Sequence, residues 1–268
     1  MRRAALALLG LLGIAAAAAP AAAQRPALSD SLVVDSRALG EARRLNVHLP
    51  DGYAAAGAAR YPLLVMPDGG MDEDFPHVVA TVDSLVALGR MRPVVVVGIP
   101  NTQRRRDLTG PTRVKEDSAI APRVGGSAAF RAFVRDELLP AVSARWRVTD
   151  ERGIIGESLA GLFVVETFLL EPTLFRHAIA LDPSLWWDRR SLVDSAAVAA
   201  RVRAAGAAPR TLTLASSGTR EIAEPTARLA ALLRGAPGLS ATYEARPDLT
   251  HATIFRAVKP AALVRAFR

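Results

Sequence analysis

The feature that most constrains this chain is a regular alternation of short apolar runs with amphipathic segments. The continuous apolar runs at 61–66 and 93–99 are typical of strands buried on both faces of a parallel sheet. The other strand patterns lie at 32–34, 45–49, 152–156, 178–181, 211–215 and 241–245. Helical patterns lie between and after them, at 78–88, 127–144, 159–171, 191–204, 225–234 and 257–267. This order predicts a doubly wound, mostly parallel α/β sheet whose first strands are antiparallel.

The amino-acid composition excludes several kinds of functional site in such a protein. The chain has 268 residues, of which 50% are hydrophobic and 22% are charged, and it contains no cysteine. Disulfides, Cys-ligated zinc, iron–sulfur clusters and a thiol nucleophile are therefore excluded. The net charge of +8 comes almost entirely from arginine, since Lys115 and Lys259 are the only lysines. These arginines are scattered and are not interleaved with aromatic residues, which disfavours nucleic acid as a partner.

The first 23 residues have the pattern of a cleaved secretory signal peptide. Two arginines near the start precede an apolar run at 4–19 and the small residues Ala21, Ala22 and Ala23. A membrane anchor is the alternative, but this run is short and rich in alanine for a spanning helix. We therefore expect a signal peptide at 1–23, one domain at 24–268, no stable membrane anchor after cleavage, and a periplasmic or secreted location. Cleavage would remove Arg2 and Arg3 and lower the net charge to +6.

The most informative motif lies where the strand pattern at 152–156 meets a helical pattern. The sequence Gly156-Glu-Ser158-Leu-Ala-Gly161 has small residues two positions before and two positions after the serine. A nucleophile elbow requires this spacing, because the strand and helix backbones approach each other closely at the turn. Ser158 is therefore the expected nucleophile, and an ordinary strand–helix turn is the alternative.

A serine nucleophile needs a base, and the chain offers four histidines, at positions 48, 77, 177 and 251. In hydrolases of this chain order the base follows the last strand. His251 meets that condition, because it lies between the pattern at 241–245 and the terminal helix. His48 and His177 fall within strand patterns and are expected to be packing residues. His77 lies close enough to the turn after the strand at 61–66 to touch a substrate.

The acid that orients the base is expected after the strand at 211–215. Glu221 is the first candidate there and Glu224 is the second. Both could instead be acids at a helix N-terminus, which the helix dipole favours. A Ser–His dyad without any acid also remains open.

Acyl transfer further requires N–H donors for the oxyanion. The backbone N–H of Leu159 is the expected first donor, because it directly follows the nucleophile. The second is expected at Gly70, in the turn Asp68-Gly69-Gly70, where glycines let the backbone approach a ligand. A plain turn is the alternative. The segment 100–126 has no periodicity and is expected to be a long functional loop.

These motifs resemble the "Putative esterase" family of α/β hydrolases, in its siderophore (enterobactin) esterase-like branch. The resemblance covers most of the chain, from 34 to 267, and rests on the segments at 36–50, 61–69, 97–109 and 182–188. It implies an α/β-hydrolase fold and places Arg106, Trp186 and Trp187 near the substrate pocket. The alternatives for these three residues are an ion pair with Asp107 and a position in the core.

The chain departs from the family pattern near the nucleophile. Glu157 stands where many relatives have histidine, Ala160 replaces a glycine, and Asp182 stands where serine is frequent. The expected protein is an exported serine esterase that hydrolyses small-molecule carboxylic esters, of siderophore or acylated-sugar type, without metal or cofactor. The alternatives are an acyltransferase of the mycolyltransferase kind and a catalytically silent binding protein of the same fold.

Overall fold

The computed structural model describes residues 30–194, 197–199, 201–202 and 209–268. The expected signal peptide at 1–23 lies outside the described residues. The eight strands are β1 (Asp30–Ser36), β2 (Glu41–His48), β3 (Tyr61–Pro67), β4 (Val95–Ile99), β5 (Val148–Glu157), β6 (His177–Leu181), β7 (Arg210–Ser216) and β8 (Leu239–Ala245). The longer helices are α1 (Phe75–Ala87), α4 (Ser127–Phe133), α5 (Leu139–Arg145), α6 (Ser158–Leu170), α9 (Arg220–Leu232) and α10 (Ile254–Phe267).

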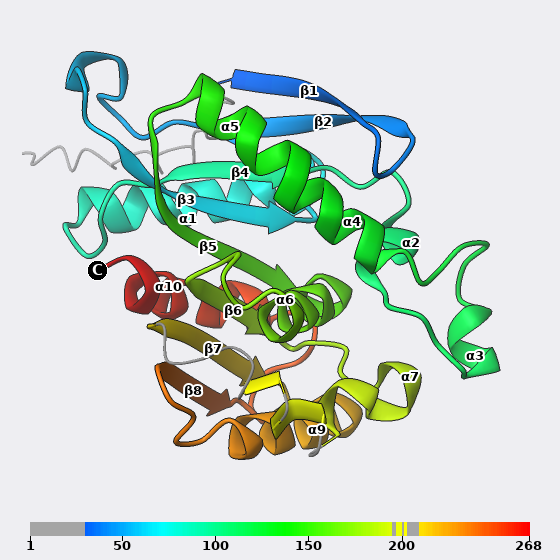
Figure 1. The fold of residues 1–268 in the computed structure, drawn as a ribbon. Coiled ribbons are helices and arrows are strands. Elements are labelled where there is room, and N and C mark those ends of the chain that lie inside the picture. The colour runs from blue at the N-terminus through cyan, green and yellow to red at the C-terminus, as the bar shows by residue number, and fades with distance from the viewer. Residues whose placement is uncertain (1–29, 195–196, 200, 203–208) are drawn as a thin grey trace, which may run out of the picture.

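The strands form one sheet in the order β1-β2-β4-β3-β5-β6-β7-β8 (Figure 1). The β1–β2 and β2–β4 pairs are antiparallel, and all the other pairs are parallel. The predicted fold class is therefore confirmed. After β3 the chain adds β4 on one side of that strand and then adds β5 on its other side, so the direction in which strands are added reverses between β3 and β5. Open α/β sheets bind ligands at such a point, beyond the carboxyl ends of the strands.

Side chains of the central strands alternate between two apolar layers. Leu63 and Val65 of β3 face the layer that includes α4, α5 and α6, and Leu64 and Met66 face the layer of α1 and α10. Figure 1 shows these two groups of helices on opposite faces of the sheet. Because both faces are covered, the central strands are apolar throughout, which explains the uninterrupted runs in the sequence.

The helices differ from the predicted ones in three places. The predicted helix at 127–144 is present, but η2 (Val134–Leu138), a turn of π-helix, joins α4 to α5. Helix α9 begins at Arg220, so that Pro225 lies inside the helix. The predicted helix at 191–204 falls partly on residues outside the description, and α7 (Trp187–Arg190) and η3 (Ser191–Val193) precede that part.

The long segment 100–126 contains α2 (Arg104–Leu108) and α3 (Lys115–Ser118), which are too short to give a periodic pattern. A buried arginine of β2 attaches this segment to the sheet. Arg43 donates hydrogen bonds to Asp107 at 2.7 Å, to Thr102 at 2.7 Å and to Glu41 at 2.9 Å. The side chains of Arg43 and Asp107 are each 1% exposed. This buried ion pair therefore determines where the loop lies relative to the strands.

Replacing Asp107 with alanine is expected to destabilise the fold by about 3 kcal/mol, because it removes the buried carboxylate partner of Arg43 and leaves the less buried Glu41 as the remaining carboxylate in contact with that charge. The measurement is the free energy of unfolding from urea denaturation. Asp136→Ala, which breaks a solvent-exposed pair with Arg135, is the control and should leave the unfolding midpoint almost unchanged. Equal effects of the two substitutions would contradict the structural role of Asp107.

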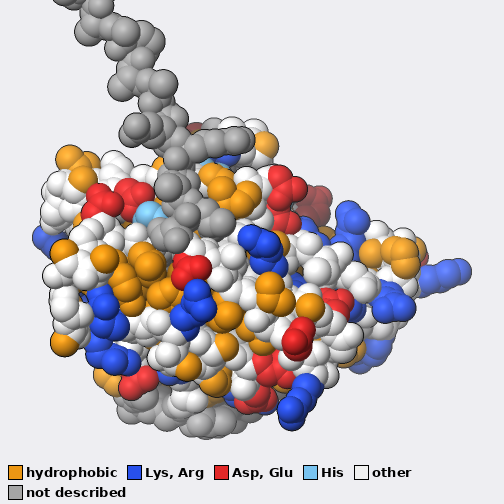
Figure 2. Space-filling model, turned by 90° about the horizontal axis from the view of Figure 1, so that it is seen from above, with side chains coloured by type: hydrophobic (Ala, Val, Ile, Leu, Met, Phe, Trp, Pro, Cys, Tyr) orange, Lys and Arg blue, Asp and Glu red, His pale blue; other side chains and the backbone are white. Residues whose placement is uncertain are grey.

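On the surface seen in Figure 2, basic side chains lie among acidic and apolar ones. Within the part of the chain that the structure describes, no helix has the length and apolar character needed to span a membrane.

Candidate active site

Ser158 lies at the turn between β5 and α6 with a φ of +57°, in the left-handed region that few non-glycine residues occupy. The turn is tight because the two elements are close together. A Cβ atom at Gly156 would lie 2.6 Å from the backbone carbon of Ala160, so only glycine fits there. Ala160 is accommodated in place of the more usual glycine. A strained strand–helix turn of this kind is typical of a nucleophile elbow.

His251 pairs with a carboxylate at the end of β6. Its Nδ1 lies 2.7 Å from Oδ2 of Asp182, whose side chain is 0% exposed, whereas that of His251 is 44% exposed. The backbone N–H of Ser217 donates to Asp182 Oδ1 at 2.6 Å, and the Ser217 hydroxyl donates to Oδ2 at 2.9 Å. Three donors therefore surround this buried carboxylate, as a buried charge requires.

The partner of His251 was expected to be Glu221, and the structure corrects this. Glu221 is exposed in the first turn of α9. Glu224 is also exposed and forms ion pairs with Arg220 at 2.6 Å and Arg190 at 3.3 Å. Both glutamates are thus acids near a helix N-terminus, which was the alternative considered for them. The carboxylate that pairs with His251 is Asp182, directly after β6, and it is held by Ser217, directly after β7.

Two residues of this site were missed from the sequence. Asp182 appeared only as a departure from the family pattern, although it is the first polar residue after the buried strand β6. No sequence motif indicates a role for Ser184. Its hydroxyl lies 3.4 Å from the Ser158 hydroxyl, and its backbone N–H donates to the Ser158 carbonyl at 3.0 Å. Side chains that follow parallel strands meet at one edge of the sheet, and that signal could have found Asp182.

The two backbone N–H groups predicted as oxyanion donors belong to the start of α6 and to the turn after β3. The Leu159 N–H is in the first turn of α6, where backbone N–H groups have no partner within the helix. The turn after β3 is pressed against the end of β4, since a Cβ at Gly69 would lie 2.1 Å from the Ile99 nitrogen. This close contact positions Gly70, whose N–H donates to Glu73 Oε2 at 2.6 Å.

An arginine near this turn, Arg104, acts electrostatically on His251. Arg104 forms a two-bond ion pair with Asp68, at 2.7 and 2.8 Å, and its positive charge opposes protonation of His251. Asp68 has a φ of +54° at the end of β3. Arg106 instead pairs with Asp107 at 2.6 Å and with Glu41 at 2.8 Å.

The two tryptophans differ in exposure. Trp187 is 4% exposed and donates its indole N–H to the Gly110 carbonyl at 2.9 Å, so it joins the long loop to the core. Trp186 is half-buried, with its ring 5.9 Å from that of Trp187. Of the other histidines, His48 and His77 pair with Asp83 and Asp74, each at 2.7 Å.

Glu157, the residue before Ser158, is an unusual carboxyl group. Burial raises its pKa to about 7; the negative charges of Asp74, Asp182 and Asp68 add to this effect, and His251 opposes it. In turn, the hydrogen bond with Asp182 raises the pKa of His251, and the charge of Glu157 raises it further. The protonation of Glu157 and of His251 is therefore linked.

This linkage predicts the effect of Glu157→Gln on the pH profile. A base must be neutral, so kcat/KM should fall as the pH decreases through the pKa of His251. Ionised Glu157 stabilises protonated His251, and a neutral glutamine does not. The acidic limb of the profile for ester hydrolysis should therefore move to lower pH in Glu157→Gln. Glu157→Asp, which keeps the charge, is the matched control; a limb that stays in place in both variants would contradict the linkage.

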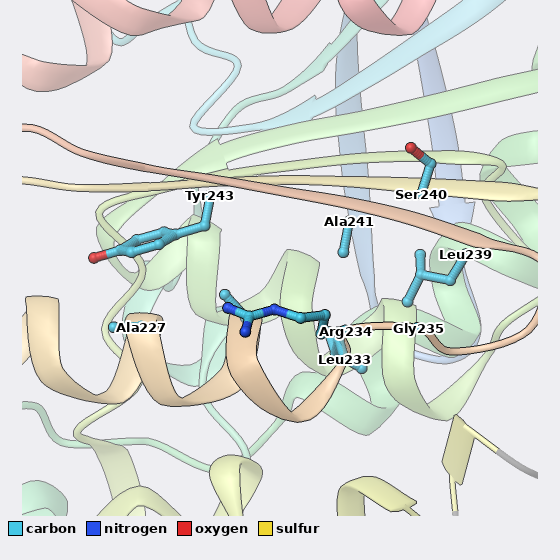
Figure 3. Close-up of a pocket in the computed structure, with 9 residues that line it drawn as sticks. Ala227, Leu233, Arg234, Gly235, Leu239, Ser240, Ala241 and Tyr243 are labelled. Carbon is cyan, nitrogen blue, oxygen red and sulfur yellow. The ribbon is translucent and has the colours of Figure 1, made fainter.

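Two cavities differ in their relation to this site. A cavity of about 490 Å³ between α9 and β8 is lined by Leu233, Arg234 and Tyr243, among others, and contains no predicted site residue (Figure 3). A second cavity, of about 240 Å³, lies in the long loop and includes Arg104 and Arg106 in its lining. Among the described residues, no group of three or more His, Asp or Glu side chains is arranged to hold a metal ion.

Comparison with curated proteins finds relatives that act on siderophores. Ferri-bacillibactin esterase BesA of Bacillus subtilis is 33% identical over 110 residues, which cover 36% of this chain and 38% of that protein. Iron(III) salmochelin esterase of Escherichia coli is 26% identical over 153 residues, which cover 55% of this chain and 34% of that protein. The chain thus spans little more than a third of the length of these two relatives.

Solved structures match over more of the chain. An IroE-like serine hydrolase from Shewanella oneidensis has a TM-score of 0.78 and 25% identity, and the match covers 88% of this chain and 78% of that one. Siderophore hydrolase EstA from Aspergillus nidulans has a TM-score of 0.73 at 18% identity, with coverage of 95% and 97%. These similarities show the α/β-hydrolase fold. The family description "Putative esterase" matches residues 36–238, more than half of the sequence, and the chain therefore belongs to that family.

Proposed function

We propose that this protein is a serine hydrolase of carboxylic esters with Ser158, His251 and Asp182 as its catalytic residues. The observation that carries the proposal is the pairing of His251 with the buried Asp182 beside a serine held in a strained strand–helix turn. A serine is a weak nucleophile at neutral pH, and a histidine oriented by a carboxylate is the common way to activate it.

In this proposal each group has one role. With Nδ1 of His251 engaged by Asp182, Nε2 is the nitrogen that remains to accept the Ser158 proton. The Ser158 oxygen attacks the ester carbonyl, and the N–H groups of Leu159 and Gly70 stabilise the oxyanion. His251 then gives its proton to the leaving alcohol as the C–O bond breaks. Water, deprotonated by His251, attacks the acyl-enzyme and releases the carboxylic acid.

We further propose an acidic ester of siderophore type as the substrate. Four arginines, at positions 104, 105, 106 and 123, line the cavity of the long loop, and Arg105 and Arg123 are exposed. Guanidinium groups suit carboxylate and catecholate oxygens. Arg106 and Trp186 would then contact the substrate from the loop and from the segment after β6. The siderophore esterases among the relatives support this choice of class. Export through the 1–23 signal is part of the same proposal.

The experiment is labelling of the protein with a fluorophosphonate, followed by a panel of esters. The phosphonate should attach to Ser158, and hydrolysis should favour esters with an acidic acyl or alcohol part over neutral ones of equal size. Added acceptor alcohols should not appear in the products; acyl transfer to them would identify an acyltransferase. Absence of labelling together with measurable siderophore binding would identify a silent binding protein.

A further inference from the structure

One of the two backbone N–H groups assigned to the oxyanion is already occupied by an anion. Gly70 is buried, and its N–H donates to Oε2 of Glu73 at a short 2.6 Å. A carboxylate oxygen therefore lies where the negatively charged oxygen of the reacting ester would need to be.

We propose that Glu73 is a carboxylate gate over the oxyanion hole, which must leave Gly70 before an ester can react at Ser158. This inference rests on the proposed function, since it assumes that Gly70 is an oxyanion donor. The gate consists of this chain's own side chain, and it regulates access to one N–H group without changing Ser158 or His251.

The local backbone brings Glu73 to this position. The Glu73 N–H donates to the Gly70 carbonyl at 3.1 Å, which closes a turn, and the side chain then returns to the Gly70 N–H. In a capping box a glutamate side chain likewise returns to the backbone N–H three residues before it, although there the reciprocal acceptor is a side chain and here it is the Gly70 carbonyl. A capping contact does not require that the N–H group have a catalytic role. Here the N–H group that Glu73 caps is also the one proposed as an oxyanion donor.

The other carboxylate oxygen is held from a different strand end. Asn101, which follows β4, donates its side-chain N–H to Glu73 Oε1 at 2.7 Å and to Asp68 Oδ1 at 2.6 Å. Asp68 is in turn bound by Arg104. Glu73 thus belongs to a network that reaches the arginine cavity, so a substrate that contacts Arg104 could loosen the gate.

The negative charge of Glu73 opposes the reaction for as long as its carboxylate accepts the Gly70 N–H. The same N–H cannot serve the Glu73 carboxylate and a developing oxyanion at full strength, and the two anions repel each other at contact distance. Further carboxylates already surround the site, at Asp68, Asp74 and Glu157. Movement of Glu73 toward solvent would relieve this crowding and expose the donor.

The test compares Glu73→Ala and Glu73→Gln with the wild-type protein, and Asp72→Ala serves as control because it removes a neighbouring exposed charge. The first readout is the rate constant for inactivation by a fluorophosphonate, in which Ser158 Oγ forms a bond to phosphorus, fluoride leaves and the serine proton passes to His251. The second readout is kcat/KM for p-nitrophenyl acetate. Loss of a charged hydrogen bond to the donor should raise both by about threefold or more in Glu73→Ala.

Glu73→Gln keeps the shape of the side chain and removes its charge, so it should give a smaller increase, and Asp72→Ala should give none. A purely structural cap predicts the opposite, namely a lower melting temperature with rates at or below those of the wild type, and that result would overturn the gate. Structures add a direct readout: in the phosphonylated protein the phosphonyl oxygen should replace Glu73 on the Gly70 N–H, and retention of that contact would also overturn the gate. A wild-type protein that is not labelled at Ser158 would instead overturn the proposed function.

Discussion

Ser158→Ala should reduce the hydrolysis of short p-nitrophenyl esters by about 10⁴-fold or more, because it removes the oxygen that forms the acyl-enzyme. The fold should persist. Alanine, like serine, has a Cβ, so the substitution adds little strain at a φ of +57°, and the Ser158 side chain has a single described partner contact, with Ser184 at 3.4 Å. The measurement is kcat/KM with the melting temperature recorded in parallel.

Ser184, whose hydroxyl contacts that of Ser158, provides a matched control. Ser184→Ala removes the hydroxyl next to Ser158 and leaves the nucleophile in place, so it should retain most of the activity that Ser158→Ala loses. Activity of Ser158→Ala at the wild-type level, in a protein that is fully folded, would refute the assignment of Ser158.

Asp182→Asn should lower kcat/KM by about 10² to 10⁴-fold, because the amide cannot stabilise the imidazolium that forms on His251 and can favour the wrong tautomer. The hydrogen bond with Asp182 raises the pKa of His251, so its loss should also move the acidic limb of the pH profile to lower pH. The backbone N–H and the hydroxyl of Ser217 would still lie at this position, but they would face the asparagine amide instead of a carboxylate. The profile of kcat/KM against pH measures both effects.

Glu221→Gln is the control that distinguishes Asp182, the acid proposed from the structure, from Glu221, the acid predicted from the sequence. It changes an exposed side chain on α9, so its effect on kcat/KM should be no more than about twofold, as for an ordinary surface substitution. A large loss in Glu221→Gln with near-normal activity in Asp182→Asn would reverse the two assignments.

Much of the site could be predicted because its signals are local. The elbow at Ser158 depends on small residues within a few positions along one strand–helix turn, and Gly156 is required there by contact with Ala160. His251 follows from chain order, since it lies between the last strand and the last helix. The buried strands β3 and β4 were visible as apolar runs for the same reason: their pattern depends on burial of both faces and not on which strand is their neighbour.

Local sequence signals could not predict which carboxylate pairs with His251, or that Arg104 pairs with Asp68. The choice between Asp182 and Glu221 depends on which strand end lies against the loop of His251, and the pairing of Arg104 with Asp68 depends on which side of α2 faces the end of β3. Along the chain His251 is 69 residues from Asp182, and Arg104 is 36 residues from Asp68. No periodicity connects residues at such separations.

The sequence by itself determined the class of sheet, through its alternating apolar and amphipathic segments, and it indicated the serine turn through small residues near one another in the chain. It indicated His251 through chain order, because that residue follows the last strand. Only the tertiary structure decided that Asp182, at the end of β6, pairs with His251, that Arg106 is held by Asp107 and Glu41, and that the Gly70 N–H donates to Glu73. These features arise where the ends of several parallel strands converge, and that convergence is set by packing of the whole sheet.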